Sequence, residues 1–181
     1  MTLQGSCRCN NISLAWKNLD FSLVPRQCGC DYCSAKLASY VSKSGTAVAV
    51  LIRQPALHRV SKHGSGQAQF HECGHCGEVA LVTASIEGEL YCALNVNCLQ
   101  DRERFPSAIR VNFSEQSPAV KRARWRETWC TPVHLPWRSG AHNLLRNRLT
   151  YLPVVYTLPS ARNLASFLHS PFRRILLFFV L

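Results

Sequence analysis

Alternation of apolar and polar positions dominates the first 100 residues. Ile12, Leu14 and Trp16 alternate with polar or small residues, which is typical of a half-buried strand. An apolar run rich in β-branched residues occupies 47–52, and a second strand through Leu57 and Val60 is expected to follow it. Further strands are expected at 67–72, 79–84 and 90–96, the last two joined by a hairpin turn at Glu87-Gly88.

Helical periodicity is almost absent over the same stretch. Only residues 31–40 could form a short helix. The pattern therefore predicts a mainly β fold in which antiparallel strands form the core, without a solenoid-type repeat. With 47% hydrophobic residues among 181, the chain can bury a core of ordinary size.

The composition changes abruptly near residue 134. Residues 1–135 hold 15 Lys and Arg and 10 Asp and Glu, whereas 136–181 hold 6 Arg and neither acid nor cysteine. We therefore predict one domain at 1–133 and a basic, apolar tail at 134–181 that is poorly ordered or not part of the domain. The tail ends in seven apolar residues, far fewer than the ~20 of a membrane span. The alternatives are a membrane-surface anchor through Arg173-Arg174 and a reading-frame accident fused to a complete domain.

Seven of the ten cysteines fall into three tight clusters: Cys7-x-Cys9, Cys28-x-Cys30-x-x-Cys33 and Cys73-x-x-Cys76. A Cys-x-Cys pair on extended backbone places both sulfurs on one face, and Cys-x-x-Cys closes a tight knuckle. Pairing the first cluster with the third fills a closed shell of four thiolates. The remaining three thiolates leave one metal position open, where ligand exchange or chemistry can take place. The pattern predicts two zinc ions per chain, and the alternatives are a disulfide framework or an iron–sulfur cluster on the four-thiol site.

The other cysteines and two nearby histidines are less specific. Cys92, Cys98 and Cys130 are expected to be small buried hydrophobes, and of these Cys98 is the one to follow. His71 and His75 flank the knuckle at residue 73 and could replace a sulfur or supply the fourth ligand of the open site. We expect instead that both imidazoles occupy a surface position or form a hydrogen bond to a ligand.

The formal net charge of +11 resembles that of a nucleic-acid-binding protein. Its distribution weakens this interpretation, because residues 1–135 carry only +5 and the tail carries +6. Seven thiolates and two Zn²⁺ would lower the charge of the first part to near +2. We therefore expect no nucleic-acid partner. The cysteine usage fits a reducing compartment, so a cytoplasmic protein without a secretory leader or transmembrane span is expected.

Four motifs stand in order along the chain: Gly5-Ser6-Cys7-Arg8-Cys9, Cys28-Gly29-Cys30-Asp31-Tyr32-Cys33, His71-Glu72-Cys73-Gly74-His75-Cys76-Gly77 and Leu94-Asn95-Val96-Asn97-Cys98-Leu99. Together they resemble the glutathione-dependent formaldehyde-activating enzyme (GFA) family, which includes the centromere protein V (CENP-V) type domain. The resemblance spans roughly residues 3–130. Many members have Gly after the first cysteine pair, where this chain has Asn10-Asn11. Asn tolerates left-handed backbone angles, so we expect the turn to survive.

The resemblance implies a β-tent (Mss4-like) fold of coiled antiparallel sheets pinned by zinc-cysteine knuckles. It implies a structural zinc on Cys7, Cys9, Cys73 and Cys76, and a functional zinc on the catalytic ligands Cys28, Cys30 and Cys33. The family's reaction joins glutathione to formaldehyde as S-hydroxymethylglutathione, and its class is carbon–sulfur lyase. The partners implied are therefore a small thiol such as glutathione and a small aldehyde.

Individual polar and basic residues are candidates for proton transfer and for substrate binding. The polar candidates for proton transfer are Asp31, Tyr32, His71 and Glu72. The basic candidates for the carboxylates of glutathione are Arg26, Lys36, Lys43, Arg53 and Arg59. Two other functions stay open: a non-catalytic zinc module that binds nucleic acid or protein, and a zinc site that responds to thiols or oxidants.

Overall fold

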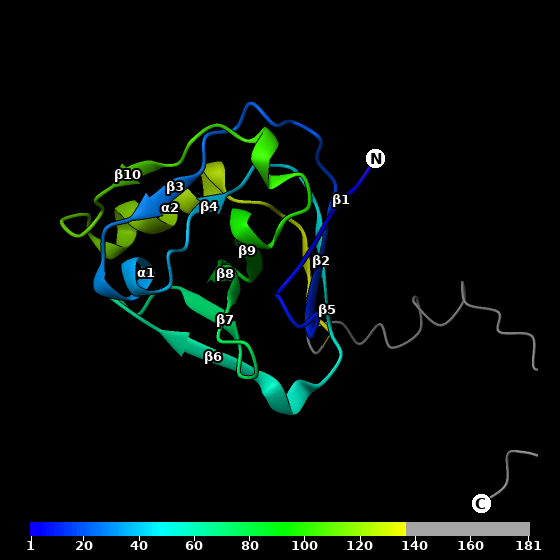
Figure 1. The fold of residues 1–181 in the computed structure, drawn as a ribbon. Helices are drawn as coiled ribbons and strands as arrows, with labels where there is room; N and C mark the ends of the chain where they lie inside the picture. The colour runs from blue at the N-terminus through cyan, green and yellow to red at the C-terminus, as the bar shows by residue number, and fades with distance from the viewer. Residues whose placement is uncertain (137–181) are drawn as a thin grey trace, which may run out of the picture. The chain divides into compact units, whose positions relative to one another are not determined.

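The computed structural model describes residues 1–136, which form two β-sheets and two short α-helices (Figure 1). The smaller sheet consists, in spatial order, of β1 (Leu3–Ser6), β2 (Ile12–Trp16), β5 (Val48–Ile52) and β11 (Val133–His134). The larger sheet consists of β10 (Ile109–Val111), β3 (Arg26–Cys28), β4 (Tyr40–Val41), β9 (Glu89–Asn95), β8 (Val79–Ile86), β7 (Gln69–Cys73) and β6 (His58–Lys62). The helices are α1 (Asp31–Ala35) and α2 (Pro118–Thr128), and 3₁₀ turns occupy Pro55–Leu57, Val96–Cys98 and Arg102–Arg104.

The mainly β prediction is confirmed, and most strands lie where the alternation placed them. The described pairings are antiparallel except for β10 with β3 and β11 with β5, which are parallel. The Glu87-Gly88 turn joins β8 to β9 with both residues at positive φ, as a two-residue hairpin requires. Asn10 has φ 59°, so the turn after the first cysteine pair does use the left-handed conformation.

Both faces of β8 are buried, which explains its nearly continuous apolar sequence. Leu81 packs into the core between the two sheets, together with Trp16 and Leu94. Its neighbour Val82 points to the opposite face and joins a second core with Trp125 of α2. Cys92, Cys98 and Cys130 are buried in the first core, as expected. Figure 1 shows β1, β2 and β5 on one side of the fold and α1, α2, β3 and β10 on the other.

The helix prediction was incomplete. α1 ends at Ala35, short of the predicted 31–40, because Leu37 has positive φ and Tyr40 begins β4. α2 was missed altogether, because Trp125 is its one buried residue and no apolar stripe repeats along it. The available signal was its start, where the hydroxyl of Ser117 accepts a hydrogen bond from the Val120 amide and Pro118 occupies the first turn.

The folded part extends slightly beyond the predicted boundary at 133. β11 includes His134, and Leu135 is 3% exposed within the core between the sheets. The predicted tail from 137 onward lies outside the described residues. Within residues 1–136, no helix has the length and apolar character needed to cross a membrane.

Candidate metal centres and cleft

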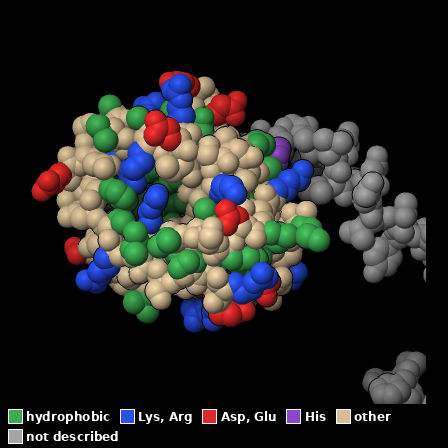
Figure 2. Space-filling view, turned by 90° about the horizontal axis from the view of Figure 1, so that it is seen from above, with side chains coloured by type: hydrophobic (Ala, Val, Ile, Leu, Met, Phe, Trp, Pro, Cys, Tyr) green, Lys and Arg blue, Asp and Glu red, His purple; other side chains and the backbone are tan. Residues whose placement is uncertain are grey.

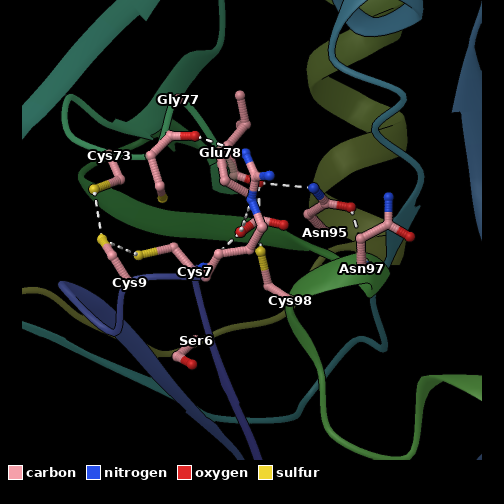
Figure 3. Close-up of polar contacts among 12 residues, drawn as sticks. Ser6, Cys7, Cys9, Cys73, Gly77, Glu78, Asn95, Asn97 and Cys98 are labelled. Carbon is pink, nitrogen blue, oxygen red and sulfur yellow. Dashed lines mark hydrogen bonds and ion pairs between the residues drawn. The ribbon is translucent and has the colours of Figure 1, made fainter.

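The first and third cysteine clusters come together as one group of four thiols. The Sγ atoms of Cys7, Cys9, Cys73 and Cys76 all lie within 4.8 Å of one another. The Cys9 sulfur is 3.7 Å from that of Cys7 and 3.4 Å from that of Cys73 (Figure 3). A zinc ion at ~2.3 Å from four sulfurs holds them about 3.8 Å apart. The donor set and its spacing therefore fit a tetrahedral metal ion.

Two backbone turns present these four thiols. In the first, the Cys7 amide donates to the Ile12 carbonyl at 2.9 Å, and the Ile12 amide donates to the Cys7 sulfur at 3.3 Å. In the second, the Gly77 amide donates to the Cys73 carbonyl at 2.8 Å, with Gly77 at φ +72°. A left-handed residue is what closes such a knuckle, and glycine adopts it without a steric penalty.

Arg8 ties the two turns together. Its amide donates to the Glu78 carboxylate at 2.7 Å, and its guanidinium donates to the Cys76 carbonyl at 2.8 Å. Without metal, burial raises the pKa of Cys7 to about 12. Burial also raises the pKa of Cys73, but the Cys76 and His75 amides outweigh it and bring the pKa down to about 6. Protons therefore compete unequally for the four sulfurs, and a metal ion would replace them.

Cys28, Cys30 and Cys33 form the second group, with their sulfurs also within 4.8 Å of one another. Cys28 ends β3, Cys30 is the N-cap residue of α1, and Cys33 is buried one turn into that helix. A hydrogen bond from the Cys33 thiol is the main reason that the pKa of Cys28 falls to about 5, with Lys121 nearby adding to the effect. The same hydrogen bond keeps the Cys33 proton in place and raises the pKa of that thiol. Of these two thiols, Cys28 is therefore the one that loses its proton more readily.

The three-thiol group opens onto a cleft of about 1440 Å³. All three cysteines line this cleft, whereas none of the four-thiol group does. Its apolar wall includes Trp125 and Trp129, whose rings stack with centroids 4.7 Å apart. Figure 2 shows the molecule from above, with a hollow that has hydrophobic side chains and Lys or Arg side chains around it.

The cleft is positively charged. Five Lys and Arg residues line it: Arg26, Lys43, Arg110, Lys121 and Arg124. No Asp or Glu lines it. The Lys43 ammonium is paired with the Asp20 carboxylate at 3.0 Å, so its charge is compensated at the rim. The arrangement favours an anionic occupant.

A network of polar contacts holds α1 against the knuckle of the four-thiol group. Lys36, just after α1, forms a 2.9 Å ion pair with Glu72 and donates to the Gly77 carbonyl at 3.0 Å. The Tyr32 hydroxyl donates to the same carboxylate at 3.1 Å, and the Tyr32 ring stacks on His63 with centroids 3.5 Å apart. We call Tyr32, Lys36 and Glu72 the interlock, because it joins the two thiol groups through side chains.

The other sequence candidates have structural positions. His71 is 1% exposed and shares hydrogen bonds with His58 at 3.0 Å and with Thr83 at 2.8 Å, and His71 and His75 belong to neither thiol group. Asp31 is exposed. Of the five basic candidates, Arg26 and Lys43 line the cleft, while Lys36, Arg53 and Arg59 do not. The sequence reasoning missed the cleft residues Arg110, Lys121, Arg124, Trp125 and Trp129. A recognised α2, with its Lys-Arg-Ala-Arg-Trp-Arg run at 121–126, was the signal that could have found three of them.

No family model matches the chain, and no curated protein matches it. Among solved structures, a crystal structure of a Rhodobacter sphaeroides protein is similar, with a TM-score of 0.45 and 19% sequence identity. The similarity covers 58% of this chain and 99% of that one.

Proposed function

We propose that this protein is a zinc enzyme of the carbon–sulfur lyase type, which forms or cleaves the adduct of a glutathione-like thiol with a small aldehyde such as formaldehyde. One observation carries the proposal: the three-thiol group, and not the four-thiol group, lines the large cleft. A closed set of four ligands suits a structural ion, whereas three ligands beside a cleft suit an ion that exchanges its fourth ligand. The resemblance to the GFA family supports the same division.

The residues present fit a zinc ion at both groups, by sulfur donors and by spacing. When bound at the three-thiol group, zinc would lower the pKa of a thiol in its fourth position and favour the thiolate. The cleft volume exceeds the ~300–1,000 Å³ of common small-molecule sites, so a tripeptide thiol and a one-carbon aldehyde can enter together.

The chain's own residues position the reactants. The basic lining attracts an anionic thiol, and the Trp125–Trp129 wall removes water from its apolar part. In the addition, the thiol sulfur forms a bond with the aldehyde carbon, the carbonyl π bond breaks, and the thiol proton ends on the oxygen. The lyase direction reverses each change. Positioning of the two reactants is the main contribution required from the protein.

The test combines metal content with exchange kinetics. We expect about two zinc ions per chain by mass spectrometry of the metal, on protein purified without chelators. We also expect the metal-loaded protein to accelerate exchange between glutathione, formaldehyde and their adduct, measured by NMR magnetisation transfer above the spontaneous rate. Cys30→Ser should abolish the acceleration and leave one zinc. Ser34→Ala, a change in the same helix outside the cleft, should preserve both.

Three results would contradict the proposal. Exchange at the spontaneous rate with both metal positions filled would exclude an enzyme for these reactants. Zinc release by mild peroxide without turnover would instead support a redox-responsive site. Cys30→Ser protein with wild-type acceleration would show that the three-thiol group is not the reaction site.

A further inference from the structure

Arg124 is a partly buried cation that forms no ion pair with a carboxylate among residues 1–136. It lies on α2 and lines the cleft. Its Nε atom is buried and has no hydrogen-bond partner among residues 1–136. The basic residues with carboxylate partners in this part of the chain are Arg8, Lys36, Lys43 and Arg126. Buried charges are normally paired, so the environment of Arg124 is unusual.

A second cation increases this imbalance. Arg26 lies on β3 two residues before Cys28, so their side chains share the face that lines the cleft. Burial, and then the nearby charge of Arg26, lower the pKa of Arg124 and outweigh the opposite effect of Cys28, so the folded chain disfavours the Arg124 charge. An anion between the two guanidinium groups would remove both costs.

The guanidinium of Arg124 packs on an aromatic ring. Its guanidinium carbon lies 3.5 Å from the centroid of the Phe113 ring. At that distance only the flat face of the guanidinium can lie on the ring, so the N–H edge is left for hydrogen bonds. A carboxylate can accept two parallel hydrogen bonds from such an edge.

We propose that Arg124, with Arg26 beside it, binds a carboxylate of the molecule that enters the cleft and thereby selects an acidic thiol over a neutral one. The inference rests on the proposed function in one respect, since it takes the occupant to be a thiol. Arg124 is then a specificity-determining residue: it holds the end of the ligand remote from sulfur, while the Trp125–Trp129 wall contacts the part between. Lys43 does not compete for this role, because Asp20 already pairs with it.

The experiment measures binding rather than turnover. The full chain, loaded with zinc, is titrated by calorimetry with three probes: glutathione, its diethyl ester, and S-methylglutathione. The ester keeps the thiol and removes the carboxylate charges, and the S-methyl compound keeps the carboxylates and blocks the thiol. We expect wild-type protein to bind glutathione about 10- to 100-fold more tightly than the ester. Arg124→Gln should lower the affinity for glutathione and for S-methylglutathione by a similar factor and leave the affinity for the ester unchanged.

Control variants separate a local effect from a general one. Arg122→Gln lies on the same helix, is exposed and does not line the cleft, so it should bind all three probes as wild type does. If Arg124→Gln does not fold, Arg26→Gln tests the same preference at an exposed position. Arg124→Lys keeps the positive charge and loses the two parallel N–H donors of the guanidinium, so its preference for glutathione over the ester should lie between those of wild type and Arg124→Gln.

The outcomes distinguish this inference from the proposed function. Equal affinity of the wild-type protein for glutathione and its ester would overturn the inference. So would an Arg124→Gln variant whose affinities for glutathione and the ester fall by the same factor, or one that binds every probe as tightly as wild type. S-methylglutathione that binds in an Arg124-dependent way would support the inference even if exchange catalysis is absent. In that case the carboxylate subsite stands and the proposed function fails.

Discussion

Replacing Gly5 by alanine should destabilise the fold strongly, although the change adds a single methyl group. A Cβ at this position would lie 2.5 Å from the carbonyl oxygen of Cys98 and 3.0 Å from Cδ2 of Leu99. Attractive contacts between heavy atoms occur near 3.5–4.0 Å, so the first contact is about 1 Å too short. The obstacle is a backbone atom, and Gly5 and Leu99 already form an isolated β-bridge there.

The expected magnitude follows from these contacts. Overpacking of a well-packed core costs about 1–3 kcal/mol, and a rigid backbone obstacle places Gly5→Ala near the upper value. For a folded part of this size, about 3 kcal/mol lowers the melting temperature by roughly 10 °C. Gly29→Ala is the matched control, because its Cβ would meet only the Val111 carbonyl at 3.8 Å and its φ is not positive.

Tryptophan fluorescence during thermal unfolding measures the difference between the two variants. Free zinc is held at one concentration, since a ligand of the folded state would otherwise shift the midpoint. A melting temperature of Gly5→Ala within about 3 °C of Gly29→Ala would refute the reasoning, because the strand would then have moved away from residue 98 at little cost.

Three further outcomes can be measured. Cys30→Ser should stay soluble and lose one metal ion per chain by elemental analysis, whereas Cys76→Ser should disrupt the four-thiol group that stabilises the fold and should precipitate. Equal solubility of the two variants would refute the division into a structural four-thiol group and a functional three-thiol group. Lys36→Met should lower the metal affinity of the three-thiol group about tenfold, measured by competition with a chelator, and leave the affinity of the four-thiol group unchanged. The Ser22 hydroxyl, then Lys43, lowers the pKa of Asp20 from 3.8 to about 2, so Ser22→Ala should raise the carbon-13 NMR midpoint. Because the folded pKa is lowered, Asp20 stabilises the fold above about pH 4, and this contribution disappears as the pH falls towards 2.

Cysteine spacing predicted the thiol groups because short spacing restricts where sulfur atoms can point. The expected extended backbone at the first pair was wrong, because Cys7 and Cys9 lie in a turn after β1 that the Asn10 amide closes by donating to the Cys7 carbonyl at 2.8 Å. Each pair is still held together locally, so only the pairing of the two turns was a long-range inference. The alternation of β2 likewise predicted its buried face, since one side of that strand packs into the core.

The cleft could not be predicted in the same way. Part of its aromatic and basic wall, Lys121, Arg124 and Trp125, comes from α2, whose exposed sequence has no apolar period and lies far from the cysteines along the chain. Arg124 reads as an ordinary surface charge in the sequence, because its burial depends on where Phe113 is placed by the fold. The Lys36–Glu72 ion pair of the interlock could not be predicted either, because two charged residues 36 positions apart give no local sign that they are in contact.

The position of the cleft wall along the chain also bears on how such a protein can diversify. Every ligand of the two thiol groups lies within residues 7–76, whereas the wall formed by β10 and α2 lies within 109–129. All seven thiols therefore come from the first stretch, whereas the second stretch supplies much of the cleft wall, to which Arg26 and Lys43 of the first stretch also contribute. Substitutions confined to residues 109–129 should therefore change which ligand the cleft prefers and leave both thiol groups intact. Natural variants, or variants that carry a different α2, should then differ in ligand preference and not in metal binding.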